Sequence, residues 1–203
     1  MTRKSSQSVF SCLHLYKWKE GDCMIEEILE FNKAFVENKG YEKYITNKFP
    51  QKKVAIVSCM DTRLTELLPA SMGLKNGDAK IIKNAGGVIS HPFGSAMRSL
   101  LIAIYELNVK EILVIGHTDC GARCTDSQKM IEKMKEHGIT QNNIDMMKYC
   151  GIDFDSWLGG FVDLDESIKK SVELIRNHPL IPQTVMIYGL IIDSETGELS
   201  RIV

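Results

Sequence analysis

The sequence predicts an α/β fold with a mainly parallel central sheet. Short apolar runs rich in β-branched residues alternate with longer helical patterns, which is the order of elements in a parallel α/β domain. The run Ile112–Ile115 is apolar throughout, as expected for a strand that helices cover on both faces. The turn sequence Ser194–Gly197 separates the last two runs and favours an antiparallel edge strand. A chain of 203 residues, 44% of them hydrophobic, can bury one full core but is short for two. We therefore expect a single domain whose sheet is flanked by helices.

The amino-terminal residues differ from the rest of the chain. Residues 1–23 are polar and lack a clear period, so we interpret them as an N-terminal extension that is disordered, binds a partner or precedes the natural start of the protein. The domain itself is expected to span residues 24–203. Its first helix begins at Met24 and stops at Gly40. The apolar stripe of this helix contains Ile25, Ile28, Leu29, Phe35 and Val36.

Strands and helices alternate after Pro50. The first three strands are expected at Val54–Ser58, Lys80–Lys83 and Ile112–Ile115. Between the first two, Leu64–Leu74 has a helical pattern that Pro69 interrupts. Between the second and third, Pro92 suits the first turn of a long helix. The apolar face of that helix contains Ala96, Leu100, Ala103, Ile104 and Leu107.

The second half of the chain continues the alternation. Helical patterns cover Ser127–Glu136 and Thr140–Tyr149. Asp163 followed by Glu166 is typical of a helix start of the capping-box type, and Pro179 ends the helix that follows. The last two strands are expected at Val185–Ile192 and Leu199–Val203.

Charge and cysteine content exclude several classes of protein. The formal net charge is −1, so no basic excess favours nucleic acid or an anionic membrane as a partner. No apolar run approaches the roughly 20 residues of a membrane span. The six cysteines are sparse and irregularly spaced, unlike those of a secreted disulfide scaffold. We therefore expect a cytoplasmic protein with free thiols.

Two short segments carry the side chains best suited to chemistry. Cys59–Arg63 directly follows the first strand, and His117–Gly121 follows the third. Together they offer two thiolates, an imidazole, a carboxylate and a guanidinium. Three nitrogen or sulfur ligands with one open position are typical of a catalytic zinc site.

The predicted topology brings these segments together. Because sites in parallel sheets form outside the carboxyl ends of the strands, both segments should meet at one edge. Asn84, Gly86 and Gly87 follow the second strand at the same edge and are expected to line the substrate pocket. Gly116 and Gly121 should give the turn from His117 to Cys120 its backbone freedom. A helix N-terminus at Cys120 would help to keep its thiolate charged.

Each candidate residue also has a purely structural interpretation. Cys59 could be a buried core thiol and His117 a hydrogen-bonded core histidine. Asp61 and Arg63 could form a structural salt bridge, and Gly86–Gly87 could be only a tight turn. The combination of all these residues favours the metal site. A phosphatase loop is excluded, because it needs five residues between its cysteine and arginine, whereas three separate Cys59 from Arg63.

Cys-x-Asp-x-Arg followed by His-x-x-Cys resembles the pattern of the β-class carbonic anhydrases. Further segments are similar to the small, archaeal-type branch of that class, at Leu74–Gly87, Arg98–Leu100, Ile175–Pro182 and Gly189–Gly197. The resemblance covers residues 24–203 and leaves 1–23 unmatched. It implies one Zn²⁺ per subunit, held by Cys59, His117 and Cys120, with Asp61 and Arg63 as a catalytic pair. It also implies a homodimer or a larger homo-oligomer, in which the helix from Met24 to Glu37 packs on the partner subunit.

The same resemblance implies the reversible hydration of CO2 to bicarbonate and a proton by zinc-bound hydroxide. Thiolate ligands should raise the pKa of the bound water above that of a three-histidine site. Asp61 would either orient that water or bind the zinc itself and close the site, and both states are open. Two alternatives also stay open: hydrolysis of COS or CS2 on the same zinc, and a non-catalytic zinc-binding regulator.

Overall fold

The computed structural model describes residues 24–203, so the extension predicted at 1–23 lies outside the described residues. The chain divides into two compact units, one that ends at Ile45 and one that spans Thr46–Val203. The first unit contains the helix α1 (Met24–Glu37) and a 3-10 turn at Glu42–Tyr44. The predicted helix from Met24 is thus confirmed. None of its residues is buried.

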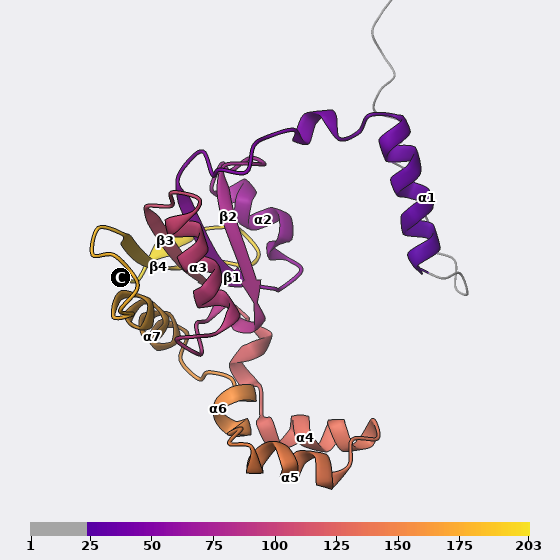
Figure 1. The fold of residues 1–203 in the computed structure, drawn as a ribbon, viewed down its shortest axis with the longest axis vertical. Helices are drawn as coiled ribbons and strands as arrows, with labels where there is room; N and C mark the ends of the chain where they lie inside the picture. The colour runs from indigo at the N-terminus through magenta and orange to yellow at the C-terminus, as the bar shows by residue number, and fades with distance from the viewer. Residues whose placement is uncertain (1–23) are drawn as a thin grey trace, which may run out of the picture. The chain divides into compact units, whose positions relative to one another are not determined.

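The second unit is built on a five-stranded sheet with the strand order β2-β1-β3-β4-β5 (Figure 1). The strands are β1 (Val54–Cys59), β2 (Ala79–Asn84), β3 (Glu111–His117), β4 (Met186–Ile192) and β5 (Leu199–Arg201). The first four run parallel, and β5 pairs antiparallel with β4. The α/β class, the mainly parallel sheet and the antiparallel edge strand are confirmed.

Helices cover both faces of this sheet, as the apolar strands predict. The helices α3 (Ser95–Tyr105) and α7 (Leu164–Arg176) contribute to the larger core, where Leu100 and Val172 are fully buried. The helix α2 (Leu64–Ser71) contributes Leu64 and Leu68 to a second core on the opposite face. This second core also contains the two cysteines of the predicted site.

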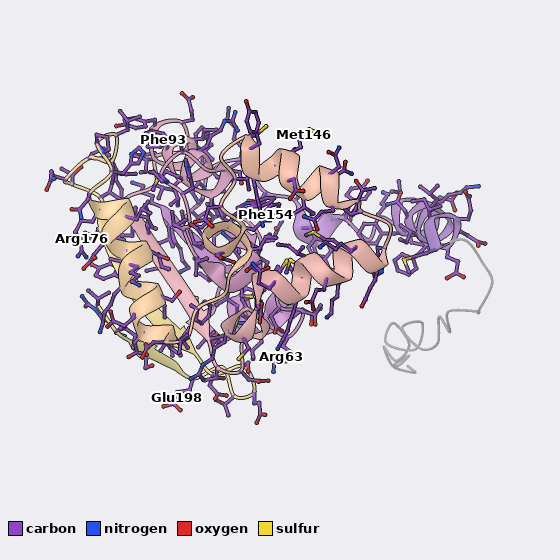
Figure 2. The ribbon with its side chains drawn as sticks, turned by 90° about the horizontal axis from the view of Figure 1, so that it is seen from below. Arg63, Phe93, Met146, Phe154, Arg176 and Glu198 are labelled. Atoms are coloured by element: carbon purple, nitrogen blue, oxygen red, sulfur yellow. The ribbon has the colours of Figure 1, made fainter. Side chains whose placement is uncertain are left out.

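Three further helices form a small satellite between β3 and α7. They are α4 (Ser127–Glu136), α5 (Gln141–Tyr149) and α6 (Phe154–Leu158). Ile131, Ile144 and Phe154 form their common core, and Figure 2 labels Phe154 where the helices meet. The five-residue α6 was not predicted, because a single turn has no measurable period. Asp153 caps it by accepting from two backbone N–H groups.

Two predicted boundaries were wrong. The helix α3 begins at Ser95, because residues 91–94 form a turn in which the His91 ring accepts from the Phe93 backbone N–H. The helix α2 continues past Pro69 to Ser71. By contrast, Asp163 caps α7 as predicted, since its carboxylate accepts from the Glu166 N–H.

The order of the strands explains where a site can form. The chain leaves β1 through α2 to reach β2 on one side, whereas β3 lies on the other side of β1. The carboxyl ends of β1 and β3 therefore border the point at which the winding of the sheet reverses, and ligands bind at such points. Among the helices of residues 24–203, none has the length and apolar content needed to cross a bilayer.

Candidate metal centre

The two chemical segments meet at the carboxyl edge of the sheet. β1 ends on Cys59, and the neighbouring β3 ends on His117. The turn that follows His117 leads to Cys120 at the same edge. The Sγ atoms of the two cysteines are 3.8 Å apart. The ligand atoms of all three side chains lie within 4.8 Å of one another, and all three residues are buried. The structure thus joins the three residues that the sequence suggested as ligands.

The spacing of the sulfur atoms fits a tetrahedral metal ion. Two Zn–S bonds of about 2.3 Å at a tetrahedral angle separate their sulfur atoms by about 3.8 Å. Cys59 and Cys120 already show this separation. Soft sulfur and imidazole ligands suit Zn²⁺ and disfavour Mg²⁺ or Ca²⁺.

The tautomer of His117 also fits a metal ligand. Its Nδ1 lies 2.8 Å from the carbonyl oxygen of Thr118. Because a carbonyl oxygen can only accept, Nδ1 carries a proton, and in the neutral ring Nε2 then has the lone pair. Nε2 is buried and has no hydrogen-bond partner among residues 24–203. A metal ion would satisfy this nitrogen, and the bond to Thr118 would fix the ring orientation.

Cys120 differs from its prediction in one respect. It precedes a four-residue 3-10 turn, Gly121–Cys124, and the N–H of Ala122 lowers the pKa of its thiol. Burial is the larger effect, however, and together with nearby Cys59 it raises the pKa of Cys120 above the ordinary value. The short turn is therefore not enough to keep the thiolate charged. A bound metal cation would favour the thiolate.

Asp61 and Arg63 form a bidentate pair beside the ligands. The Nε of Arg63 donates to Asp61 Oδ1 at 3.0 Å, and Nη2 donates to Oδ2 at 2.9 Å. These bonds hold the pKa of the Asp61 carboxyl well below its usual range, and the carboxylate raises the pKa of Arg63 in return. Asp61 Oδ2 lies 3.9 Å from His117 Nε2. The ionised carboxylate thus faces the nitrogen that would bind a metal.

Asp119 was not singled out from the sequence, although it lies between two candidate ligands. Its φ of +52° is the left-handed turn of the His117–Cys120 segment. The prediction that Gly116 and Gly121 supply this freedom was wrong, since neither has a positive φ. Aspartate tolerates the left-handed region better than most residues. A motif spaced as His-x-Asp-Cys could have drawn attention to it.

The residues expected to line the pocket have different surroundings. The Asn84 side chain bonds both the N–H and the carbonyl of Val88, at 3.1 and 2.7 Å, and so closes its own turn. Gly87 lies against the Cys59 backbone. Gly86 faces a Cβ of Ala122 and the ring of Phe161, at 3.2 and 3.3 Å from where its own Cβ would be.

Three further residues near the site were missed. Ala122 and Phe161 pack against the core that contains Cys59 and Cys120, so they add an apolar wall next to Gly86. Lys83 donates from Nζ to the carbonyl oxygens of Cys59 and Leu64, both at 3.3 Å. It thereby spans the segment that carries Asp61 and Arg63. None of these residues belongs to a spaced motif, so the sequence offered no signal for them.

The sequence and the fold of the chain are similar to those of known proteins. A β-carbonic anhydrase from Trichomonas vaginalis has a TM-score of 0.82 and 37% sequence identity, over 90% of this chain and 98% of the other. A family model described as carbonic anhydrase matches residues 54–199. The chain belongs to the β-carbonic anhydrase family.

The relatives of this chain are named for two different activities. YtiB of Bacillus subtilis (strain 168), whose name marks it as a provisional carbonic anhydrase, is 55% identical over 89% of this chain and 96% of its own. A carbon disulfide hydrolase of Acidithiobacillus thiooxidans is 32% identical over 73% of this chain and 76% of its own. The β-carbonic anhydrase fold thus serves proteins named for different substrates.

Proposed function

We propose that this member of the β-carbonic anhydrase family catalyses the reversible hydration of CO2 to bicarbonate and a proton, with one Zn²⁺ per subunit. The observation that carries the proposal is the buried Cys59–His117–Cys120 cluster with an ionised carboxylate 3.9 Å from its free nitrogen. Zinc held there would supply the Lewis acidity that makes a hydroxide nucleophile available at mildly alkaline pH.

Asp61 is suited to orient the attacking oxygen. An ionised carboxylate can only accept hydrogen bonds, so Asp61 would take one from the nucleophile and turn a lone pair of its oxygen toward the carbon of CO2. Arg63 keeps Asp61 ionised and fixes its plane through the bidentate pair. Phe161 and Ala122 offer apolar surface to a substrate that has no net dipole. A purely structural zinc site has no need of the Asp61–Arg63 pair.

Substitution of Asp61 tests the proposal. Asp61→Ala is expected to lower kcat/KM for CO2 hydration by about 100-fold or more, the usual scale for a residue that handles a proton or orients a nucleophile. Stopped-flow CO2 hydration under reducing conditions measures this, and metal analysis should show one zinc in both proteins. Asp165→Ala, which removes an exposed carboxylate from the start of α7, is the control. Wild-type protein with full zinc and no hydration activity would refute the function, and unchanged kinetics in Asp61→Ala would refute the role.

Hydrolysis of CS2 or COS is the second candidate. It is favoured by relatives named carbon disulfide hydrolases at 32% identity or less. The more similar relatives, at 51% and 55% identity, bear names that assign them to carbonic anhydrase. A side-by-side assay of CO2, COS and CS2 on one zinc-loaded preparation separates the two, and we expect CO2 to be preferred.

We also propose that the protein forms a homodimer or a larger homo-oligomer, in which α1 packs on the partner subunit. The exposed apolar residues of α1 include Ile25, Ile28 and Leu29. Light scattering after gel filtration should give a dimer, and Ile28→Asp with Leu29→Asp should weaken it, because the change places charge in an apolar contact. Lys33→Asp on the same helix is the matched control. A wild-type monomer at micromolar concentration would contradict the proposal.

We propose a cytoplasmic location because the cysteines of the described residues are free thiols. The four cysteines within residues 24–203 are all free, and zinc thiolates persist in a reducing compartment. Cell fractionation would test this location.

A further inference from the structure

Arg63 joins the two loops that carry the candidate ligands. It makes four side-chain hydrogen bonds, two to each loop. Two go to Asp61, on the loop after Cys59. The other two go to Asp119, with Nη1 donating to Oδ2 at 3.0 Å and Nη2 donating to the backbone oxygen at 2.9 Å. Arg63 is labelled in Figure 2.

Asp119 contributes to this bridge from an unusual position. It lies between His117 and Cys120 in the left-handed conformation. Its side chain is 86% exposed, yet its carboxylate and its carbonyl both point to the same guanidinium. An arginine loses much rotamer freedom when it is held in this way, so two acceptors on one side strongly restrict where the planar group can lie. Asp119 therefore limits the positions in which the Arg63 guanidinium can donate to Asp61.

We infer that Asp119 is a positioning residue that keeps Asp61 away from the fourth metal position. Asp61 Oδ2 is 3.9 Å from His117 Nε2, close enough that the carboxylate could turn and bind a metal held by the three ligands. The bidentate pair with Arg63 opposes that turn, and Asp119 anchors Arg63. Without the Asp119 carboxylate, Arg63 is tied to the His117–Cys120 loop only through the Asp119 backbone oxygen. The guanidinium is then free to shift together with Asp61, and the carboxylate can compete for the metal. The inference rests on the proposed metal site, not on the turnover of CO2.

Azide binding to the cobalt-substituted protein tests this inference. Co²⁺ in a thiolate site absorbs visible light, and its spectrum changes when an anion occupies an open fourth position. Asp119→Gly removes the carboxylate and suits the left-handed φ, so the backbone is not strained. Asp119→Asn keeps the shape of the side chain but loses its charge, and asparagine also tolerates this φ.

We expect azide to bind Asp119→Gly about tenfold more weakly than the wild type, because the apparent affinity falls with the fraction of open sites. Asp119→Asn should lie between the two. Adding Asp61→Ala to Asp119→Gly should restore azide binding, since the competing carboxylate is gone. Asn108→Gly is the matched control. Asn108 also has a left-handed φ, of +59°, but it precedes the first residue of β3, whereas the candidate ligands lie at the last. Its azide affinity should stay within about twofold of the wild type.

Three results would overturn the inference. They are wild-type azide affinity in Asp119→Gly, failure of the double variant to recover azide binding, and an effect of Asn108→Gly as large as that of Asp119→Gly. If Asp119→Gly does not hold cobalt, the same comparison is made with Asp119→Asn and its double variant. A protein without CO2 hydration but with this azide pattern would refute the proposed reaction and keep the positioning role.

Discussion

Gly87 has a φ of +66° and lies against the strand that ends on Cys59. A Cβ placed on Gly87 would come within 2.7 Å of the Cys59 backbone nitrogen and 3.2 Å of the Ile115 carbonyl oxygen. Backbone atoms of a central strand cannot move aside without moving the ligand. Gly87, which the sequence placed in the substrate pocket or in a tight turn, is therefore needed for the close approach to the strand that ends on Cys59.

Substitution of this glycine should show how much the close approach matters. Gly138→Ala is the matched control, because Gly138 has a φ of +89° but nothing within 4 Å of its Cβ position. The control should lose about 1–2 kcal/mol of unfolding free energy from the left-handed backbone alone. Gly87→Ala should lose about 1–3 kcal/mol more through overpacking. It should also retain less zinc. Urea unfolding and metal analysis measure both, and equal losses in the two variants would contradict the role of close approach.

The types of the candidate ligands could be predicted at this scale, but their local conformations could not. Cys59, His117 and Cys120 are recognisable because few other side chains bind zinc. The left-handed Asp119 was missed because glycine is the usual choice for a positive φ, and two glycines lay nearby. Its contact with Arg63 depends on a loop that is remote in the sequence.

The turn between β4 and β5 supports the neighbouring ligand loop. Asp193 Oδ1 accepts from the N–H groups of Glu195 and Thr196, at 3.0 and 2.7 Å. Thr118, next to His117, accepts from the N–H of Ser194 at 2.9 Å. The backbone N–H of Thr196 is the largest of several hydrogen bonds that hold the pKa of Asp193 below its usual range.

A pH-dependent stability should follow from Asp193. Because its pKa is lowered on folding, its contribution is present above the ordinary carboxyl pKa of about 4 and is lost as the pH falls through the folded value. Asp193→Asn should therefore destabilise the protein at pH 7, and the difference from the wild type should shrink below about pH 4. Urea midpoints measured with a chelator present, so that metal loss affects neither protein, test this. Glu195→Gln, in the same turn, should change the midpoint much less. A constant difference from pH 7 to 3 would argue against the role of Asp193.

Most elements were predictable because their periods are long enough to read. The strands and the helices α1, α4, α5 and α7 lie close to their predicted positions. The failures were α6, which is a single turn, the start of α3, which lies three residues after the predicted proline, and the interruption of α2 that was expected at Pro69. Local turns compete with the first turn of a helix, and the difference in free energy between the two is too small to be predicted from a sequence pattern.

At the scale of the whole molecule, the candidate centre belongs to one of the two large cores of the sheet unit and not to the other. The larger core, formed with α3 and α7, contains none of the three candidate ligands. The core on the α2 face includes Cys59 and Cys120 themselves. The sheet should therefore form without metal, whereas the edge that carries the ligands should not be fully stable.

Metal removal tests this division. With zinc at about 1,000 times its dissociation constant, binding adds about 4 kcal/mol of stability, so a chelator should lower Tm by about 10 °C in a chain of this size. The far-UV circular dichroism spectrum at 25 °C should hardly change. Cys59→Ser, which lacks one ligand, should respond little to the chelator. Complete unfolding on metal removal, or no change in Tm, would contradict the expectation.

The sequence by itself determined the class of fold, the order of strands and helices along the chain and the identity of the candidate ligands. Hydrophobic period, proline and glycine positions, and the scarcity of zinc-binding side chains are local properties that a single chain displays. Only the tertiary structure decided which strands are neighbours, which nitrogen of His117 is free, and that Arg63 reaches Asp119. Each of these depends on distances between segments far apart in the sequence, and such distances are set by packing and hydrogen bonding in the folded molecule.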